Sequence, residues 1–234
     1  MIKVSISVII PVYNEENYIN EIIKKVNEVK IKKEIIVIND GSTDCTKKKL
    51  KKIRINNLKI INNKVNKGKG HAIRCALKYV KNDIVIIQDA DLEYNPSDYI
   101  KLIKPFMKKK VSVVYGSRFL EKKVFGIEKG LNHNYRYIIN RFLTLIFNIL
   151  NKQKLTDAHT CYKVFRSKII KKLNLVEKGF SFCPEFSTKV VKLGYKIYEV
   201  PISYTPRSKL EGKKISYKDG FHAIRALIKF RFFR

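Results

Sequence analysis

Residues 84–93 read IVIIQDADLE, and this stretch carries the first evidence on fold and function. The run of four apolar residues bounded by polar ones predicts a buried strand. Carboxylates follow on Asp89, Asp91 and Glu93, where they can converge on one hard cation. Oxygen ligands of this kind suit Mg²⁺ or Mn²⁺, which keep open positions for the phosphate oxygens of a substrate. A solvated acidic turn is the alternative, but the position directly after a buried strand favours the metal site.

The sequence on either side of this stretch alternates between short apolar runs and longer helical patterns. We expect strands at 5–10, 34–38, 58–61, 84–87 and 111–115. We expect helices at 15–29, 69–80 and 95–107, with a lysine-rich helix after residue 44. This alternation predicts βαβ units and an α/β fold with a mostly parallel sheet flanked by helices. Ligands bind beyond the carboxyl ends of the strands in such sheets, and the unusual polar clusters all lie there.

Three further polar clusters follow predicted strands. The segment 40–44 reads DGSTD, and its first carboxylate, on Asp40, can accept a hydrogen bond from a ribose or a base edge. A helix N-cap is the alternative reading of this segment. The segment 11–15, PVYNE, is also compatible with a simple turn from strand to helix. The segment 66–70, NKGKG, lacks the P-loop and dinucleotide-binding patterns, but a cationic, glycine-rich loop that opens a helix can approach a nucleotide closely.

The second half of the sequence is less regular. Residues 135–150 predict a helix with a broad apolar face, residues 184–193 another helix, and residues 196–204 a strand. The last stretch, 217–234, predicts a basic amphipathic helix. We therefore expect one domain over 1–216, followed by a helical segment at 217–234. Its basic polar face and aromatic residues favour a membrane interface, with core packing and a solvated basic face as the alternative.

The composition narrows the possible partners. With 234 residues and 45% hydrophobic content, the chain can bury a substantial core, which excludes intrinsic disorder. Its 50 basic and 20 acidic residues give a net charge of +30, which attracts nucleic acid, phosphorylated metabolites or an anionic membrane. The four cysteines are scattered and predict reduced thiols. We see no signal peptide and no apolar run of roughly 20 residues, so we expect a cytoplasmic protein without a transmembrane helix, peripheral at the inner face of the membrane.

Taken in order, the motifs PVYNE, DGSTD, NKGKG, DAD and Gly116-Ser117-Arg118 resemble those of the family 2 glycosyltransferases, which have the GT-A fold. Within that family the chain resembles the dolichyl- or polyprenyl-phosphate sugar synthases, typified by dolichyl-phosphate mannose synthase. The resemblance extends through DAHTCYK at 157–163, Pro184-Glu185, EVPISY at 199–204, Arg207 and GKKI at 212–215.

The resemblance implies roles for individual residues. Binding of the nucleotide-sugar donor would fall to Pro11, Tyr13, Glu15, Asp40, Lys69, Asp89 and Arg118. Binding of Mg²⁺ or Mn²⁺ would fall to Asp91 and Glu93. Contacts to the acceptor phosphate or the diphosphate would come from Arg136, Asn140, Lys209 and Lys214.

Catalytic roles are implied for Asp89, Asp157 and Arg207. Asp157 matches a position where inverting family members often carry a base. However, a phosphate monoester has a second pKa near 6, so a polyprenyl phosphate is already largely dianionic at neutral pH. Orientation of a sugar hydroxyl or of Arg207 is therefore the alternative role for Asp157.

The implied reaction is inverting, metal-dependent transfer of a hexose from a GDP-mannose- or UDP-glucose-type donor to dolichyl or undecaprenyl phosphate. The chain would bind an anionic membrane surface itself, or would rely on a separate membrane-anchoring protein. One alternative is a glycolipid or polysaccharide acceptor in surface glycan assembly. A remote alternative is nucleic-acid binding, which the carboxylates after residue 88 disfavour because they repel phosphate. The Q-x-x-R-W motif of processive synthases cannot be present, since the chain has no Trp.

Overall fold

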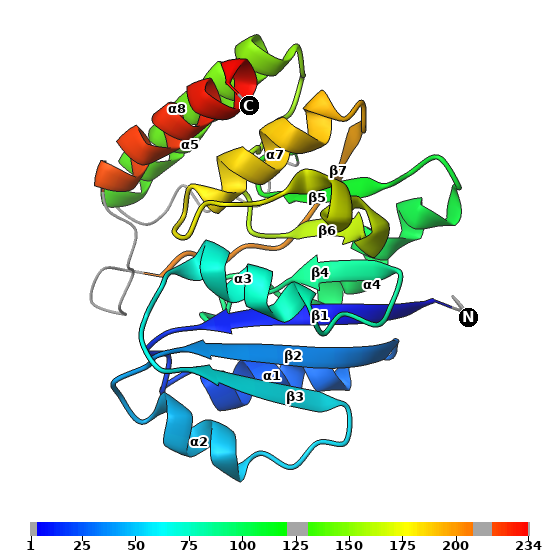
Figure 1. Ribbon diagram of the computed structural model, residues 1–234, viewed down its shortest axis with the longest axis vertical. Coiled ribbons are helices and arrows are strands. Elements are labelled where there is room, and N and C mark those ends of the chain that lie inside the picture. The colour runs from blue at the N-terminus through cyan, green and yellow to red at the C-terminus, as the bar shows by residue number, and fades with distance from the viewer. Residues whose placement is uncertain (1–3, 121–130, 208–216, 234) are drawn as a thin grey trace.

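The computed structural model describes residues 4–120, 131–207 and 217–233, with the backbone alone at 131–136, 217 and 218. Over these residues the chain forms one sheet of seven strands in the order β3-β2-β1-β4-β6-β5-β7 (Figure 1). The strands are β1 (Ser5–Val12), β2 (Lys32–Asp40), β3 (Leu58–Asn63), β4 (Ile84–Ile87), β5 (Val113–Ser117), β6 (Lys163–Arg166) and β7 (Ile197–Pro201).

The sheet is mostly parallel, as predicted. Only β6 runs against its neighbours β4 and β5, while the other described pairings are parallel. The carboxyl ends of the six other strands therefore meet along one edge. β6 was not predicted, because a four-residue strand that begins with a lysine has no apolar run to mark it.

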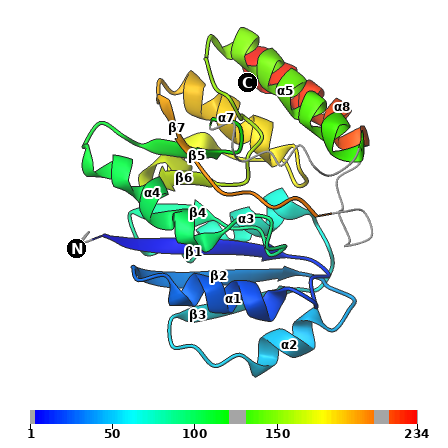
Figure 2. The same ribbon diagram turned by 180° about the vertical axis from the view of Figure 1, so that it is seen from behind.

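Helices cover both faces of the sheet. The helices α3 (Lys69–Leu77) and α7 (Phe182–Lys192) lie on the face toward the viewer in Figure 1. The opposite face carries α1 (Ile19–Glu28) and α4 (Tyr99–Ile103), as Figure 2 shows. The short helices α2 (Thr46–Lys52) and α6 (Ile170–Leu173) complete the connections. Strands β1 and β4 are almost entirely buried between these layers, which explains their nearly continuous apolar sequences.

The helix predicted at 95–107 is broken into three pieces. A 3₁₀ turn at Pro96–Asp98 precedes α4, and a second at Lys104–Met107 follows it. Pro105 accounts for the second break, since proline lacks the amide hydrogen and its ring clashes with the carbonyl four residues earlier. The break ends the α-helical segment one turn early.

The two long helices of the second half, α5 (Leu131–Asn151) and α8 (Tyr217–Phe232), lie side by side beyond the β5–β7 end of the sheet (Figures 1 and 2). α8 is fixed to the rest of the chain through four buried residues: Ala223, Ala226, Leu227 and Phe230. Among the described residues, no helix is both long enough and apolar enough to cross a membrane.

Candidate active site

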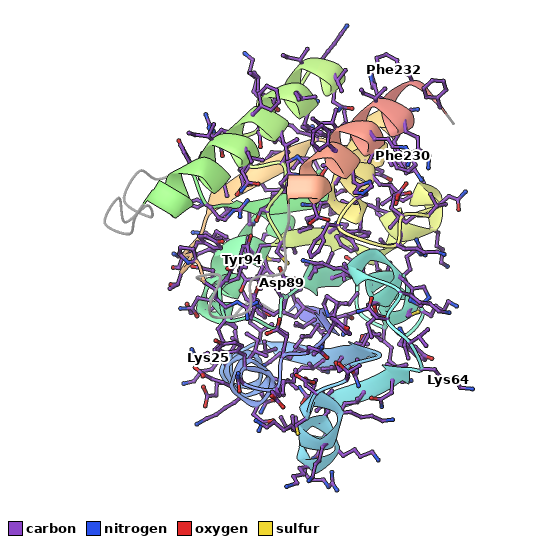
Figure 3. The ribbon with its side chains drawn as sticks, turned by 90° about the vertical axis from the view of Figure 1, so that its left-hand side faces the viewer. Lys25, Lys64, Asp89, Tyr94, Phe230 and Phe232 are labelled. Atoms are coloured by element: carbon purple, nitrogen blue, oxygen red, sulfur yellow. The ribbon has the colours of Figure 1, made fainter. Side chains whose placement is uncertain are left out.

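The predicted polar clusters meet at the edge where the parallel strands end. Figure 3 views the molecule from the side toward which these strands point, and Asp89 and Tyr94 lie near the middle of that view. The contributing segments are the loops after β1, β2, β4 and β5, and the residues that follow β7. Segments as distant in sequence as Glu15 and Arg207 are in direct contact here.

Asp89 forms an ion pair with Lys69 at the start of α3. The Lys69 Nζ lies 2.5 Å from Asp89 Oδ1 and 3.5 Å from the Sγ of Cys161. Burial opposes the charge on Asp89, but Lys69, with further contributions from Cys161 and Arg207, lowers the pKa of the carboxyl below its usual value. Burial likewise opposes the charge on Lys69, and Asp89 raises the pKa of the amine well above its usual value. Both groups are therefore charged at neutral pH.

Asp91 and Glu15 share one guanidinium. The Arg207 Nη2 lies 3.3 Å from Asp91 Oδ2, and its Nη1 lies 3.0 Å from Glu15 Oε2. All three side chains are largely buried. This contact joins the loop after β1, the loop after β4 and the segment after β7 into one charged cluster.

Asp91 lies in a surplus of negative charge. Burial, together with the charges of Asp89 and Glu93, raises the pKa of Asp91 to about 7. A divalent cation bound here would relieve that repulsion. The described residues contain no preformed group of three or more metal-ligating side chains. Mg²⁺ commonly binds through one or two carboxylates plus substrate phosphates, so Asp91 with Asp89 fits such a cation.

Glu93, the third predicted carboxylate, contacts the segment after β7. Its Oε2 accepts a hydrogen bond from the Tyr204 hydroxyl at 2.9 Å, and its Oε1 accepts one from the backbone N–H of Arg207 at 2.9 Å. The side chain is 7% exposed. Both oxygens thus accept hydrogen bonds from protein groups.

Asp157 forms a bidentate pair with Arg118. The Arg118 Nε lies 2.7 Å from Oδ2 and its Nη2 2.9 Å from Oδ1, with the Arg118 backbone N–H donating a third bond at 3.2 Å. Burial opposes the charge on Asp157, but Arg118 lowers the pKa of the carboxyl below its usual value. A carboxylate held in this way is a weak base. The contact orients Arg118, whereas the sequence suggested a sugar hydroxyl or Arg207.

Asp40 is buried and holds the glycine-rich loop. Its Oδ2 accepts hydrogen bonds from the backbone N–H groups of Lys67 at 3.0 Å and Gly68 at 2.7 Å, and its Oδ1 accepts one from Asn63 at 2.7 Å. Gly68 has a φ of +92°, and a Cβ there would lie 2.7 Å from the carbonyl oxygen of Lys178. Only glycine fits this close approach. Asp40 thereby places Lys69 beside Asp89.

The loops after β1 and β2 are interlocked. Asn14 donates through its backbone to Ser42 and through its side chain to Thr43, and the Asp44 carboxylate accepts from the N–H groups of Glu16 and Thr46. The Asp44 carboxylate thus accepts from the first amide of α2, within the segment that the sequence offered as a helix N-cap. Pro11 and Tyr13 are partly buried beside these loops.

Three of the predicted acceptor-binding side chains, those of Arg136, Lys209 and Lys214, lie outside the described residues. Asn140, the fourth, is partly buried on α5. No motif in the sequence pointed to Gln88, whose Oε1 accepts from two buried tyrosine hydroxyls, those of Tyr99 at 2.8 Å and Tyr162 at 2.7 Å. Its position directly after a buried strand was the one feature of the sequence that could have identified Gln88 as a buried polar residue.

α5 and α8 expose apolar side chains in regular stripes. On α5 the stripe has the spacing i, i+4, i+7, i+11 and consists of Ile138, Phe142, Leu145 and Ile149. On α8 the exposed residues are Phe221, Ile228 and Phe232, with Arg225 between them. Ile149 is 69% exposed and Phe232 is 66% exposed, while Phe230 on the opposite face of α8 is buried (Figure 3). We refer to these two stripes together as the α5–α8 face.

The chain is similar to several known proteins. The family model described as glycosyl transferase family 2 matches residues 7–173. An uncharacterized protein of Methanocaldococcus jannaschii is 31% identical over 218 residues, which cover 91% of this chain and 87% of that protein. The dolichyl-phosphate beta-glucosyltransferase ALG5A of Trichomonas vaginalis is 26% identical over 252 residues, covering 99% of this chain and 74% of that protein.

Two further comparisons extend this similarity. The low-salt glycan biosynthesis hexosyltransferase Agl6 of Haloferax volcanii is 27% identical over 96% of this chain, which spans 53% of that protein's length. Among solved structures, the glucosyl-3-phosphoglycerate synthase of Mycobacterium tuberculosis, in complex with Mn²⁺, UDP and phosphoglyceric acid, superposes with a TM-score of 0.72. It is 18% identical and covers 99% of this chain and 80% of that one, which shows a shared fold.

Proposed function

The chain belongs to glycosyl transferase family 2 and has the GT-A fold, and on this premise we propose that it transfers a hexose from a nucleotide sugar to a polyprenyl phosphate at a membrane surface. The observation that carries the proposal is the cluster of Asp89, Asp91, Lys69 and Arg207 at the strand ends. Carboxylates and cations alternate there within hydrogen-bonding distance. Such an arrangement suits a substrate that brings both a diphosphate and a divalent cation.

Asp91, with Asp89 beside it, would hold Mg²⁺ or Mn²⁺, and the bound cation would supply electrostatic stabilisation of the leaving diphosphate. Arg118 and Arg207 are buried cations in this region that would contact phosphate oxygens of the substrates. Their guanidinium groups are fixed in place by Asp157 and Glu15, so they need little reorganisation during the reaction. An acceptor phosphate needs little deprotonation at neutral pH, which agrees with the weak basicity of Asp157.

The α5–α8 face supports a lipid acceptor. Aromatic and aliphatic side chains project to the surface from both helices, and the basic residues Arg141, Arg225 and Lys229 are exposed among or beside them. Apolar residues flanked by basic ones are typical of helices that lie in the interface of an anionic bilayer. We propose that this face rests on the membrane from which the polyprenyl phosphate is taken.

The relatives support two acceptor classes. ALG5A carries the name of a dolichyl-phosphate glucosyltransferase, which agrees with the polyprenyl-phosphate proposal. Agl6 carries the name of a hexosyltransferase of glycan biosynthesis, which favours a lipid-linked glycan as the second candidate. The exposed apolar stripes suit either acceptor, since both are attached to lipid.

The test is transfer of label from a panel of radiolabelled nucleotide sugars, with Mg²⁺ or Mn²⁺, into short-chain polyprenyl phosphate. We expect label in the organic phase that is lost with EDTA and with Asp91→Ala. If the protein binds the donor but transfers sugar only to a lipid-linked glycan, that glycan is the acceptor in place of polyprenyl phosphate. Failure to bind any nucleotide sugar would overturn the proposal.

A further inference from the structure

Glu93 follows Asp91 by two residues, yet the chain turns sharply between them. Leu92 has a φ of +60°, in the left-handed region that residues other than glycine rarely occupy. The turn is closed by a hydrogen bond from the Glu93 N–H to Asp91 Oδ1 at 3.2 Å. The two neighbouring carboxylates therefore contact different groups.

Glu93 binds the segment 204–207 at three points. Its carbonyl oxygen accepts from the Thr205 N–H at 2.9 Å, its Oε1 from the Arg207 N–H at 2.9 Å, and its Oε2 from the Tyr204 hydroxyl at 2.9 Å. A β-bridge between Tyr94 and Tyr204 extends the contact, and their ring centroids lie 5.3 Å apart. Both the backbone and the side chain of Glu93 thus take part.

The segment 204–207 follows β7, which ends at Pro201 and is the last strand among the described residues. Thr205 and Pro206 are exposed, whereas Arg207 is buried with its guanidinium against Glu15 and Asp91. A buried arginine reaches its partners only if its backbone is fixed. The hydrogen bond that the Arg207 N–H donates to Glu93 Oε1 fixes this backbone directly.

We propose that Glu93 is a positioning residue, which fastens the segment 204–207 so that Arg207 reaches Asp91 and Glu15, and that it is not a ligand of the divalent cation. Moving its carboxylate toward a cation beside Asp91 would break the bonds to Tyr204 and Arg207. It would also leave a backbone N–H unpaired beside a buried guanidinium, an arrangement that folded proteins avoid. Two carboxylates remain for the cation, which is sufficient for Mg²⁺ or Mn²⁺ when phosphate oxygens complete the shell.

The first test is hydrogen exchange at the Thr205 and Arg207 amides of the full chain without metal or substrate. We expect Glu93→Ala to speed exchange at Arg207 by about tenfold, as expected from the loss of one buried hydrogen bond, and Asp91→Ala to speed it less, because the Arg207 N–H then keeps its acceptor on Glu93. Tyr204→Phe removes only the hydroxyl and should give a smaller increase. Glu93→Gln keeps the length of the side chain and should fall between the wild type and Glu93→Ala, so the series is informative even if the alanine variant folds poorly.

The second test is Mn²⁺ binding in the presence of a nucleoside diphosphate, followed by electron paramagnetic resonance. Asp91→Ala should lose binding, while Glu93→Gln should keep the Mn²⁺ affinity within about threefold, because a positioning residue outside the metal shell changes affinity little compared with a ligand. A loss in Glu93→Gln equal to that in Asp91→Ala, with unchanged exchange at Thr205 and Arg207, would overturn the inference.

A kinetic test rests on the proposed transferase reaction, whereas the exchange and Mn²⁺ tests do not. We expect Glu93→Ala to lower kcat more than it raises the donor KM. We also expect the double variant with Arg207→Ala to be no slower than Arg207→Ala alone, because both changes remove the same positioned guanidinium. Additive losses would contradict the proposed coupling. Wild-type protein without transferase activity would refute the proposed function and leave the exchange result to decide the role of Glu93.

Discussion

The strand-end site and the α5–α8 face both depart from the usual distribution of residues, in opposite directions. The site buries charged side chains such as Asp157 and Arg207, while the α5–α8 face exposes Phe142, Ile149 and Phe232. Buried charge is normally avoided unless it is paired, and large exposed apolar patches are uncommon on monomeric proteins. The site therefore suits a charged ligand and the α5–α8 face an apolar one, which agrees with the proposed transfer from a nucleotide sugar to a lipid phosphate.

The largest effect is expected where charge is most deeply buried. Asp157→Asn leaves the guanidinium of Arg118 buried without its charged partner, so we expect the free energy of unfolding to fall by about 3–5 kcal/mol in urea titrations. Asp83→Asn is the matched control, because Asp83 pairs with Arg166 at the surface, where such pairs contribute about 1 kcal/mol or less. Equal losses of unfolding free energy in the two variants would show that burial does not increase the contribution of the Asp157–Arg118 pair to stability.

The same pair predicts a pH dependence. Arg118 holds the pKa of Asp157 below its ordinary value of about 4, despite burial. The stabilisation from this carboxylate is therefore fully present above about pH 4 and is lost as the pH falls through the depressed folded-state pKa. Urea titrations from pH 6 downward should show Asp157→Asn losing less stability in acid than the wild type. Parallel pH profiles would contradict the assignment.

The next largest effect is expected on binding of the donor and its cation at the strand-end site. Asp91→Asn keeps the shape of the side chain but removes its charge, so donor binding with Mn²⁺ should weaken by about 100-fold in calorimetric titrations. Circular dichroism should show an unchanged fold. The exposed Asp83→Asn again serves as control, and donor affinity equal to that of the wild type in Asp91→Asn would remove Asp91 from the proposed metal site.

The corresponding change on the apolar side is smaller. The double variant Phe142→Ser, Ile149→Ser should weaken binding to anionic vesicles by about 10- to 100-fold, because each side chain contributes about 1 kcal/mol or more of apolar burial in lipid. Stability should change little, since both side chains are exposed. Val65→Ser, an exposed apolar residue far along the chain from either helix, should leave sedimentation with vesicles unchanged. An equal loss of vesicle binding in Val65→Ser would show that binding does not depend on the α5–α8 face.

The smallest effect is electrostatic. Arg225→Gln should weaken binding to anionic vesicles by roughly fivefold, from about 1 kcal/mol per basic residue near the membrane surface. Vesicles of neutral lipid should show no difference. Lys24→Gln removes the same charge from an exposed position on α1, and a similar loss there would show that net charge alone drives binding.

The first half of the chain was the more predictable part. Strands β1 to β4 were found within a few residues of their predicted bounds, because buried parallel strands have apolar sequences bounded by turn residues. β7 ends at Pro201, earlier than the predicted 204. The residues that follow it donate hydrogen bonds to carboxylates elsewhere in the chain and do not continue the strand. Asp98 accepts from the Ser203 N–H at 2.7 Å, and Glu93 accepts from the residues after it. Such attraction across about a hundred residues leaves no local pattern.

The sequence indicated which side chains gather at the strand-end edge, but not how they pair. Asp89, Asp91, Asp157 and Arg207 were identified from motifs, and the structure brings them to one edge of the sheet. The sequence suggested Arg207 as a partner of Asp157, whereas the structure pairs Asp157 with Arg118, next to the end of the neighbouring strand. Pairing depends on strand order and register, which the motifs do not contain.

For the two long helices, too, local sequence patterns determined some properties and the tertiary structure decided others. The sequence by itself determined that residues 135–150 are helical and broadly apolar, that polar clusters follow the parallel strands, and that the charge is strongly positive, since periodicity and turn chemistry act locally. Only the tertiary structure decided that Leu143 and Phe147 are buried while Phe142 and Ile149 face outward. It alone also decided that Glu93 accepts hydrogen bonds from the segment 204–207. A side chain's partner is set by which segments the sheet brings together, and this is a property of the whole fold.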